Sequence, residues 1–115
     1  KTNKMAVYNI PTIFKGDTFE DLQFTLSIDG VPEDLTDYGI SCKFRKRAKT
    51  GEEVKSISIL SGITLVDATA GVFKIDAFQQ DWTPCTYYYD IEFTDGTDIN
   101  TYVEGTLIIK QDVTY

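Results

Sequence analysis

Apolar and polar residues alternate with a period of two along much of this chain, a pattern typical of β-strands with one buried face. The clearest example lies between Tyr87 and Phe93, where every second residue is apolar. It is followed by Asp95-Gly96, a dipeptide that accepts the positive φ angles of a tight turn. A second β-rich run, residues 100–109, comes directly after this turn. The two runs therefore predict a central β-hairpin.

Six further β-rich runs precede the hairpin, and turn residues separate them. The runs are 6–14, 19–29, 40–45, 54–60, 63–66 and 72–75. Turns at intervals of about 8–12 residues are typical of a sandwich or barrel. We therefore expect one all-β domain over residues 1–115, an immunoglobulin-like antiparallel β-sandwich of about 7–8 short strands, with a small β-barrel as the alternative. A corner at 77–84 before a tyrosine-bearing strand favours the immunoglobulin-like choice.

The same pattern predicts how individual residues are placed. Proline cannot donate to a strand ladder, so Pro11 is expected at a sheet edge, with a bulge or a switch between sheets. The run 19–29 alternates most strictly and is expected to be one strand, followed by a turn at 29–32. Leu35 is expected to plug one end of the sandwich. Leu22, Leu26, Phe44, Ile91 and Leu107 are predicted to point inward, and the last inward row is predicted to be Val103, Gly105, Leu107 and Ile109.

Length and charge narrow the classes of function. A chain of 115 residues can bury about two-thirds of its unfolded surface, enough for a core of its own. Its net charge of −7 repels phosphate backbones and anionic lipids, so neither nucleic acid nor a membrane is expected as a partner. No apolar run of about 18 residues and no secretory apolar region is evident. Residues 1–4 are interpreted as a remnant of expression before Met5, or the chain as a processed or excised domain.

The two cysteines, Cys42 and Cys85, are too few for a typical small domain framed by disulfides. We expect both to be free, buried thiols in a reducing compartment. A single disulfide between the sheets is the alternative.

Few residues suggest catalysis. The chain has no histidine, which excludes Ser-His-Asp and Cys-His pairs, and it has no glycine-rich phosphate loop. The neighbouring acids Glu52 and Glu53, like Asp34 and Asp37, fit solvated loops better than a glycosidase pair. Cys85 lacks a histidine base. We therefore expect no enzyme, no catalytic residue and no cofactor.

Residues 95–100 gather several oxygen ligands, but they lack the length and the final glutamate of a twelve-residue calcium loop. A hairpin turn with polar flanks explains them better. No metal site is therefore predicted.

A run of positive charge is the main candidate for an interface. It consists of Lys43, Arg45, Lys46, Arg47 and Lys49, which are five of the eleven positively charged residues. The ordinary interpretation is the solvated face of a strand and its loop, where lysines discourage edge pairing. A second interpretation is electrostatic docking onto an acidic face of another copy or of a partner protein. Nucleic-acid binding is the weakest interpretation, because only Phe44 interleaves an aromatic ring with the charges.

Trp82, Tyr87, Tyr88 and Tyr102 could together form a platform on which sugars stack. That arrangement would make the protein a carbohydrate- or surface-binding β-sandwich module. Trp82 is more often an anchor of the core, because its large apolar area is costly to expose.

Several landmarks, in order, resemble one known family. They are Lys15-Gly16-Asp17, Asp29-Gly30-Val31-Pro32, Asp34-Leu35-Thr36, residues 40–45, Gly71-Val72-Phe73-Lys74-Ile75, residues 87–91, residues 101–105 and Asp112-Val113-Thr114. In their order and spacing they resemble the N-terminal domain of phage baseplate upper proteins and related small β domains of tailed-phage or prophage structural proteins. The likeness covers most of the chain from residue 15 onward.

The resemblance implies a non-enzymatic structural module of a phage or prophage tail, baseplate or adhesion device. Its expected location is the virion, and its expected partners are other virion proteins or further copies of itself. Members of the family usually continue into a helical or oligomerising segment, whereas this sequence stops at Tyr115. The chain is therefore interpreted either as a fragment or as a small virion protein. The resemblance transfers no catalytic or binding residue.

Overall fold

A computed structural model describes residues 6–111 and shows an all-β protein. The strands are β1 (Ala6–Val7), β2 (Ile10–Phe14), β3 (Thr18–Phe19), β4 (Leu22–Thr25), β5 (Ser27–Ile28), β6 (Val31–Pro32), β7 (Gly39–Lys46), β8 (Glu53–Ile59), β9 (Gly62–Asp67), β10 (Val72–Ile75), β11 (Phe78–Gln79), β12 (Cys85–Asp95) and β13 (Asp98–Lys110). One turn of 3-10 helix, η1 (Ala68–Ala70), precedes β10. The expectations for residues 1–4 and 112–115 lie outside the described residues.

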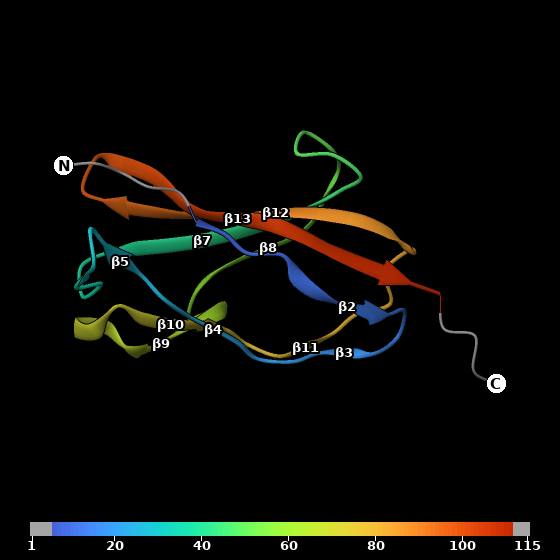
Figure 1. Cartoon of the computed structure of the whole chain (residues 1–115), viewed down its shortest axis with the longest axis horizontal. Coiled ribbons are helices and arrows are strands. Elements are labelled where there is room, and N and C mark those ends of the chain that lie inside the picture. The colour runs from blue at the N-terminus through green and yellow to red at the C-terminus, as the bar shows by residue number, and fades with distance from the viewer. Residues whose placement is uncertain (1–5, 112–115) are drawn as a thin grey trace.

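Nine of these strands form one strongly curled sheet, a half-barrel, and two small sheets complete the fold. The order in the large sheet is β1-β13-β12-β7-β8-β9-β10-β4, with β2 also alongside β13. Figure 1 shows β7, β12 and β13 in one layer and β4, β9 and β10 in the layer facing it. The sheet curls where β8 leads into β9, since these two strands pair only through Ser58–Gly62 and Ile59–Ile63.

Most strand pairs are antiparallel as predicted, but three are parallel. β1 and β2 both run parallel to β13, and β8 runs parallel to β9. A regular parallel ladder needs a long connection, and β1 and β2 are separated from β13 by most of the sequence. β8 and β9 are instead joined by only two residues, and their parallel contact is limited to Ser58–Gly62 and Ile59–Ile63. The prediction of a purely antiparallel sheet is therefore wrong at these three pairs.

The predicted central hairpin is confirmed. β12 and β13 pair from Cys85–Ile109 to Asp95–Asp98, and Gly96 takes a φ of 65° in the turn. The register shifts at one point, where Val103 lies opposite Ile91 but Thr101 lies opposite Glu92. The extra residue, Tyr102, is therefore buried together with Val103. Alternation alone predicted Val103 and missed Tyr102.

The prediction of one continuous strand over 19–29 is wrong. The run is divided into β3, β4 and β5, which pair with β11, β10 and β6 respectively. At the first break Asp21 accepts hydrogen bonds from the Ala77 amide at 2.9 Å and from Lys74 Nζ at 3.0 Å. At the second, the Leu26 carbonyl accepts from the Glu33 amide at 3.0 Å. Because three partners share the run, it bends twice. Alternation is broken at Glu20 and Asp21, which are both exposed, and it holds from Leu22 to Ile28.

The N-terminal run lies at a sheet edge with an irregular register, as Pro11 predicted. β1 and β2 are separated at Tyr8, whose carbonyl oxygen accepts a hydrogen bond of 2.7 Å from the Tyr89 hydroxyl. Gly105 of β13 lies next to the same carbonyl group, since a Cβ atom on Gly105 would come 1.8 Å from the Tyr8 carbonyl oxygen. Only glycine allows this close approach of two backbones. We call β1, Tyr8, Asn9 and β2 together the strap.

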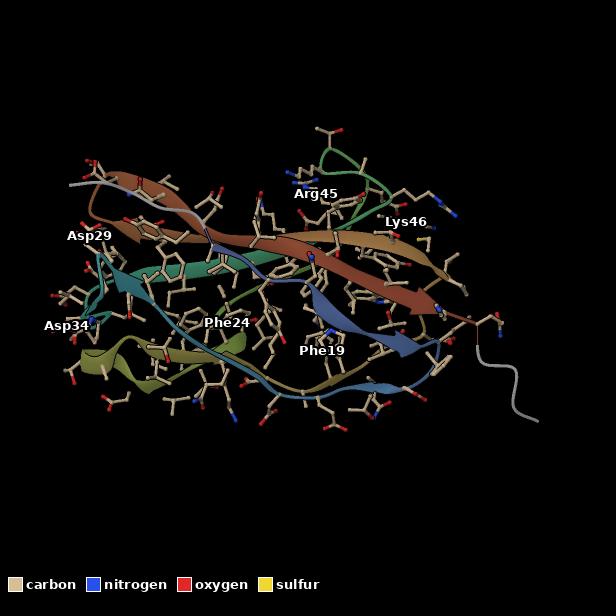
Figure 2. The ribbon with its side chains drawn as sticks, viewed as in Figure 1. Phe19, Phe24, Asp29, Asp34, Arg45 and Lys46 are labelled. Atoms are coloured by element: carbon tan, nitrogen blue, oxygen red, sulfur yellow. The ribbon has the colours of Figure 1, made fainter. Side chains whose placement is uncertain are left out.

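The core fills the space between the two layers. Figure 2 shows Phe19 and Phe24 between them. Of the five predicted inward side chains, Leu26, Phe44, Ile91 and Leu107 are buried, while Leu22 is only partly buried against the core. In the predicted last row Val103, Leu107 and Ile109 are buried. Leu35 is fully buried, as its predicted role as an end plug requires.

Both cysteines are free thiols, as predicted, and the disulfide alternative is not formed. Cys42 is buried, but Cys85 is only partly so. Burial raises the pKa of the Cys42 thiol, and the nearby Asp90 carboxylate adds to the shift. Cys42 is therefore a poor nucleophile in the folded protein.

Candidate interaction surface

The structure divides the predicted basic run into two groups. Lys43 and Arg45 lie on the outer face of β7, because Cys42 and Phe44 occupy the buried parity. Lys46, at the end of the strand, continues the alternation of Cys42 and Phe44 toward the inner face. It lies opposite Tyr87 of β12 in the register.

The remaining two basic residues are in the loop after β7. Arg47 is exposed with a φ of 69°, and its amide donates to the Thr86 carbonyl at 2.9 Å. Lys49 is also exposed. Figure 2 shows this loop rising from the layer near Arg45 and Lys46.

Three of the five cations are partly neutralised within the molecule. Arg45 donates to the Gly51 carbonyl at 3.1 Å and lies 3.9 Å from the Glu53 carboxylate. Lys49 lies 3.4 Å from Glu104 on β13. Lys43 is opposite Asp90 in the register of β7 and β12. Glu104 and Asp90 lie on strands far from the run in sequence, so the run of charge could not show their proximity to it.

Asp90 lies among these cations on the outer sheet face and is partly desolvated. Burial and the neighbouring Glu92 raise the pKa of its carboxyl group, and Glu104 on β13 adds to the effect. Arg45 and Lys43 oppose it. The raised pKa therefore reflects mainly the burial of this carboxyl group, which the adjacent cations only partly offset.

Lys43, which lies opposite Asp90 in the register, makes no ion pair within residues 6–111, and neither do Lys46 and Arg47. Lys46 and Arg47 lie at the same turn of the chain, where β7 ends. They are therefore the members of the predicted interface that keep charge available for a partner.

Acidic residues gather at one end of the molecule, around the loop 29–38 and the β12–β13 turn. Figure 2 shows Asp29 and Asp34 at that end of the long axis, away from Arg45 and Lys46. Tyr38 and Asp95 line two adjoining hollows there. Tyr38 donates a hydrogen bond of 2.5 Å to Glu33, and this bond, with burial, raises the pKa of the Tyr38 hydroxyl. Hydrogen bonds from Thr36 lower the pKa of the Asp34 carboxyl group.

The predicted hairpin turn at 95–98 is confirmed. Within residues 6–111, no group of three or more acidic or cysteine side chains is arranged to hold a metal ion. No helix in the same part of the chain is long and apolar enough to cross a membrane.

Trp82 is an anchor of the core, as the ordinary interpretation predicted. Its ring lies 5.6 Å from Phe44, 5.8 Å from Phe78 and 5.0 Å from Tyr87, measured between centroids. The Tyr87 hydroxyl donates a hydrogen bond of 2.7 Å to the Thr83 carbonyl, and this bond links the corner at residues 77–84 to β12. Tyr87 and Tyr102 are both buried, and Tyr102 packs on Phe93 instead. These aromatic rings therefore do not form an exposed platform for sugar stacking.

Sequence reasoning missed an apolar seam between the strap and β4. Two hollows lie along it, one of about 280 Å³ and one of about 300 Å³, and Tyr8 and Leu22 line both. The first is completed mainly by Ile10, Ile13 and Phe19, and the second by Phe24, Tyr102 and Val103. The residues that line the seam are far apart in sequence, so no sequence pattern indicates that they meet. The one feature of the sequence that could have suggested the seam is that β4 contains no charged residue.

The comparisons with known proteins add no relative to this picture. No protein-family model matches the chain, and no curated protein matches its sequence.

Proposed function

We propose that the protein is a non-enzymatic structural module of a phage or prophage tail, baseplate or adhesion device. Its partners are other virion proteins or further copies of itself, and its location is the virion. The order of sequence landmarks that resembles the baseplate upper protein family supports this proposal. The distribution of charge on the folded chain supports it independently.

The observation that carries the proposal is the separation of charge along the molecule. The principal-axis extents are 49 × 26 × 23 Å, so the chain is elongated. Asp29 and Asp34 lie at one end, whereas Arg45 and Lys46 lie on the other half of the long axis. Arg47, next in the chain, is exposed. Two unlike patches on one subunit fit a heterologous contact, in which the acidic end of one module faces the basic loop of the next.

We further propose that the half-barrel is an immunoglobulin-like sandwich whose two layers are joined at one edge. The consecutive neighbours β13, β12, β7 and β8 would form one sheet, and β4, β10 and β9 the other. The pairing order supports this assignment. The bond from Tyr87 to Thr83 also supports it, because a tyrosine that fastens the corner before its strand is typical of that architecture. Such sandwiches commonly serve as contact modules on cell surfaces, but fold alone does not establish function.

The experiment is reconstitution with the proteins encoded by neighbouring genes. We expect the purified chain to co-sediment with at least one tail or baseplate protein, and we expect Arg47→Glu to reduce this co-sedimentation. Arg47→Gln is the matched control, and its effect should be intermediate because it removes the charge without reversing it. A chain that binds none of these proteins, nor itself, contradicts the proposal.

A glycan array tests the alternative carbohydrate- or surface-binding module. Reproducible, saturable binding to one glycan class would favour that alternative. Trp82→Ala is unsuitable for this purpose because Trp82 supports the core. Tyr88→Ala is the better variant, since Tyr88 lies on the outer face of β12 and lines the hollow next to Arg45.

A further inference from the structure

Among the described residues, 6–111, β4 is the last strand of the large sheet and pairs on one side only, with β10. The strap lies across the seam from its other side. Tyr8 of the strap meets Phe24 of β4 edge-on, with 5.9 Å between ring centroids. The two apolar hollows lie on either side of this contact. The half-barrel therefore has an open strand edge next to unfilled apolar surface.

The open edge presents main-chain hydrogen-bonding groups. The Leu26 amide donates to the Gly71 carbonyl at 2.8 Å, in register with the pairing of β4 and β10. Main-chain groups alternate between the two sides of a strand, so Leu22 and Phe24 also direct theirs toward β10. Gln23 and Thr25 consequently present N–H and C=O groups to the open side. Each is a site at which an added strand could pair.

The strap, at the opposite end of the large sheet, carries a residue that discourages pairing, namely Pro11. Charged residues and proline are the usual protection of exposed edges. β4, with the sequence Leu-Gln-Phe-Thr, has neither. An edge left unprotected beside an apolar seam is the arrangement found where a peptide strand is bound.

Charge indicates what kind of segment fits. Within residues 6–111, neither hollow is lined by lysine or arginine, whereas Glu20 and Asp21 lie at the rim of one. Asp21 is held by Lys74 and the Ala77 amide. Glu20 makes no ion pair within residues 6–111. The whole chain carries a net charge of −7, which favours a cationic ligand over a second copy.

We propose that β4 binds an extended segment of a partner protein in which apolar residues alternate with lysine or arginine. The segment adds as a strand at Gln23 and Thr25, its apolar side chains enter the hollows beside Tyr8, and one cation faces Glu20. This interface is distinct from the basic loop. It rests on the proposed function only in taking the partner to be a protein.

A peptide titration followed by amide NMR tests this inference. The probe is an end-capped hexapeptide of alternating valine and lysine, added to the isotope-labelled chain. We expect saturable shifts and slower hydrogen exchange at the Gln23 and Thr25 amides. A peptide with serine in place of valine keeps the charge and should bind at least about 10-fold more weakly, because it leaves the hollows empty.

Two variants of the protein separate edge pairing from charge attraction. Gln23→Pro removes an N–H on the open side without removing a hydrogen bond to β10, and it should abolish binding, whereas Gln23→Ala should retain it. Glu20→Lys should weaken binding several-fold and does not depend on proline being tolerated in β4.

Three results would overturn the inference. The first is the absence of saturable shifts around β4 at millimolar peptide. The second is unchanged affinity in folded Gln23→Pro and Glu20→Lys. The third is protection of Gln23 and Thr25 that rises with protein concentration alone, which would assign the edge to a second copy. The Arg47 variants should not alter peptide binding, so this proposal and the proposed function can fail separately.

Discussion

Phe44 shows how much a single side chain contributes to this core. It is fully buried, and its ring lies within 6.4 Å of the rings of Phe19, Phe78, Trp82 and Tyr89. Aromatic packing of this kind adds to the energy of burial itself. The inward parity of β7 was predicted from alternation alone, and the structure confirms it.

We expect Phe44→Ala to lower the free energy of unfolding by about 3–5 kcal/mol, because it removes a buried aromatic ring and leaves a cavity. Denaturant titration at neutral pH measures the change. Leu60→Ala is the matched control, since Leu60 is 96% exposed and its truncation should change stability by less than about 0.5 kcal/mol. A loss below about 1 kcal/mol for Phe44→Ala would show that its neighbours collapse into the space.

Asp90 gives a prediction about pH. Desolvation raises its pKa in the folded state above the ordinary value of 3.8, so the folded protein binds this proton more tightly than the unfolded chain does. Stability linked to Asp90 therefore falls as pH rises through that window, and above it the ionised carboxylate penalises folding. We expect Asp90→Asn to raise the melting temperature at pH 7. The gain should disappear near pH 3, where Asp90 is protonated in both states. A lower melting temperature at pH 7 would mean that Lys43 and Arg45 outweigh burial.

At the scale of elements, Gly105 controls how the strap meets the sheet. We expect Gly105→Ala to destabilise the fold by about 1–3 kcal/mol, the usual cost of overpacking, because the new methyl group would displace Tyr8. Loss of hydrogen-exchange protection at the Tyr8 amide, which normally donates to Glu104, would locate the damage in the strap. Gly39→Ala is the control, since a Cβ there meets only Thr94 Cβ at 3.6 Å and Thr94 O at 4.0 Å. Equal stability of both variants would be evidence against a tight strap.

The elements also show what alternation can and cannot predict. It identified the buried rows of β7 and β12 because parity depends only on which side of a strand faces the core. It could not show that residues 19–29 change partner twice, since that depends on Asp21 meeting Ala77 across the fold. The basic run was visible in the sequence, whereas its neutralisation by Glu53 and Glu104 was not. The seam at β4 was also missed, because it too depends on contacts between residues that are far apart in sequence.

For the whole molecule, we predict self-association or partner binding that weakens with salt. Contacts between exposed charges are screened within about 8 Å at physiological ionic strength. Sedimentation at high protein concentration should show larger species at low salt than at high salt. Arg47→Glu should reduce them without lowering the melting temperature. Arg45→Glu is a poor choice, because Arg45 also holds Gly51 in the loop. Association that is insensitive to both salt and Arg47 would assign the contact to another surface.

The pairing of the strap with β13 has a consequence for the order of folding. The turn between β12 and β13 closes a very short loop, whereas the contact of Asn9 with Thr106 spans 97 positions. Closing the longer loop costs more chain entropy, so the hairpin should form early and the strap should dock last. Substitutions in the hairpin should therefore slow folding, whereas Asn9→Ala should mainly speed unfolding. Stopped-flow kinetics would distinguish the two, and a strap that forms in the transition state would reverse this order. Before the strap docks, the apolar seam at β4 is uncovered, and this intermediate is the form of the chain most prone to aggregate.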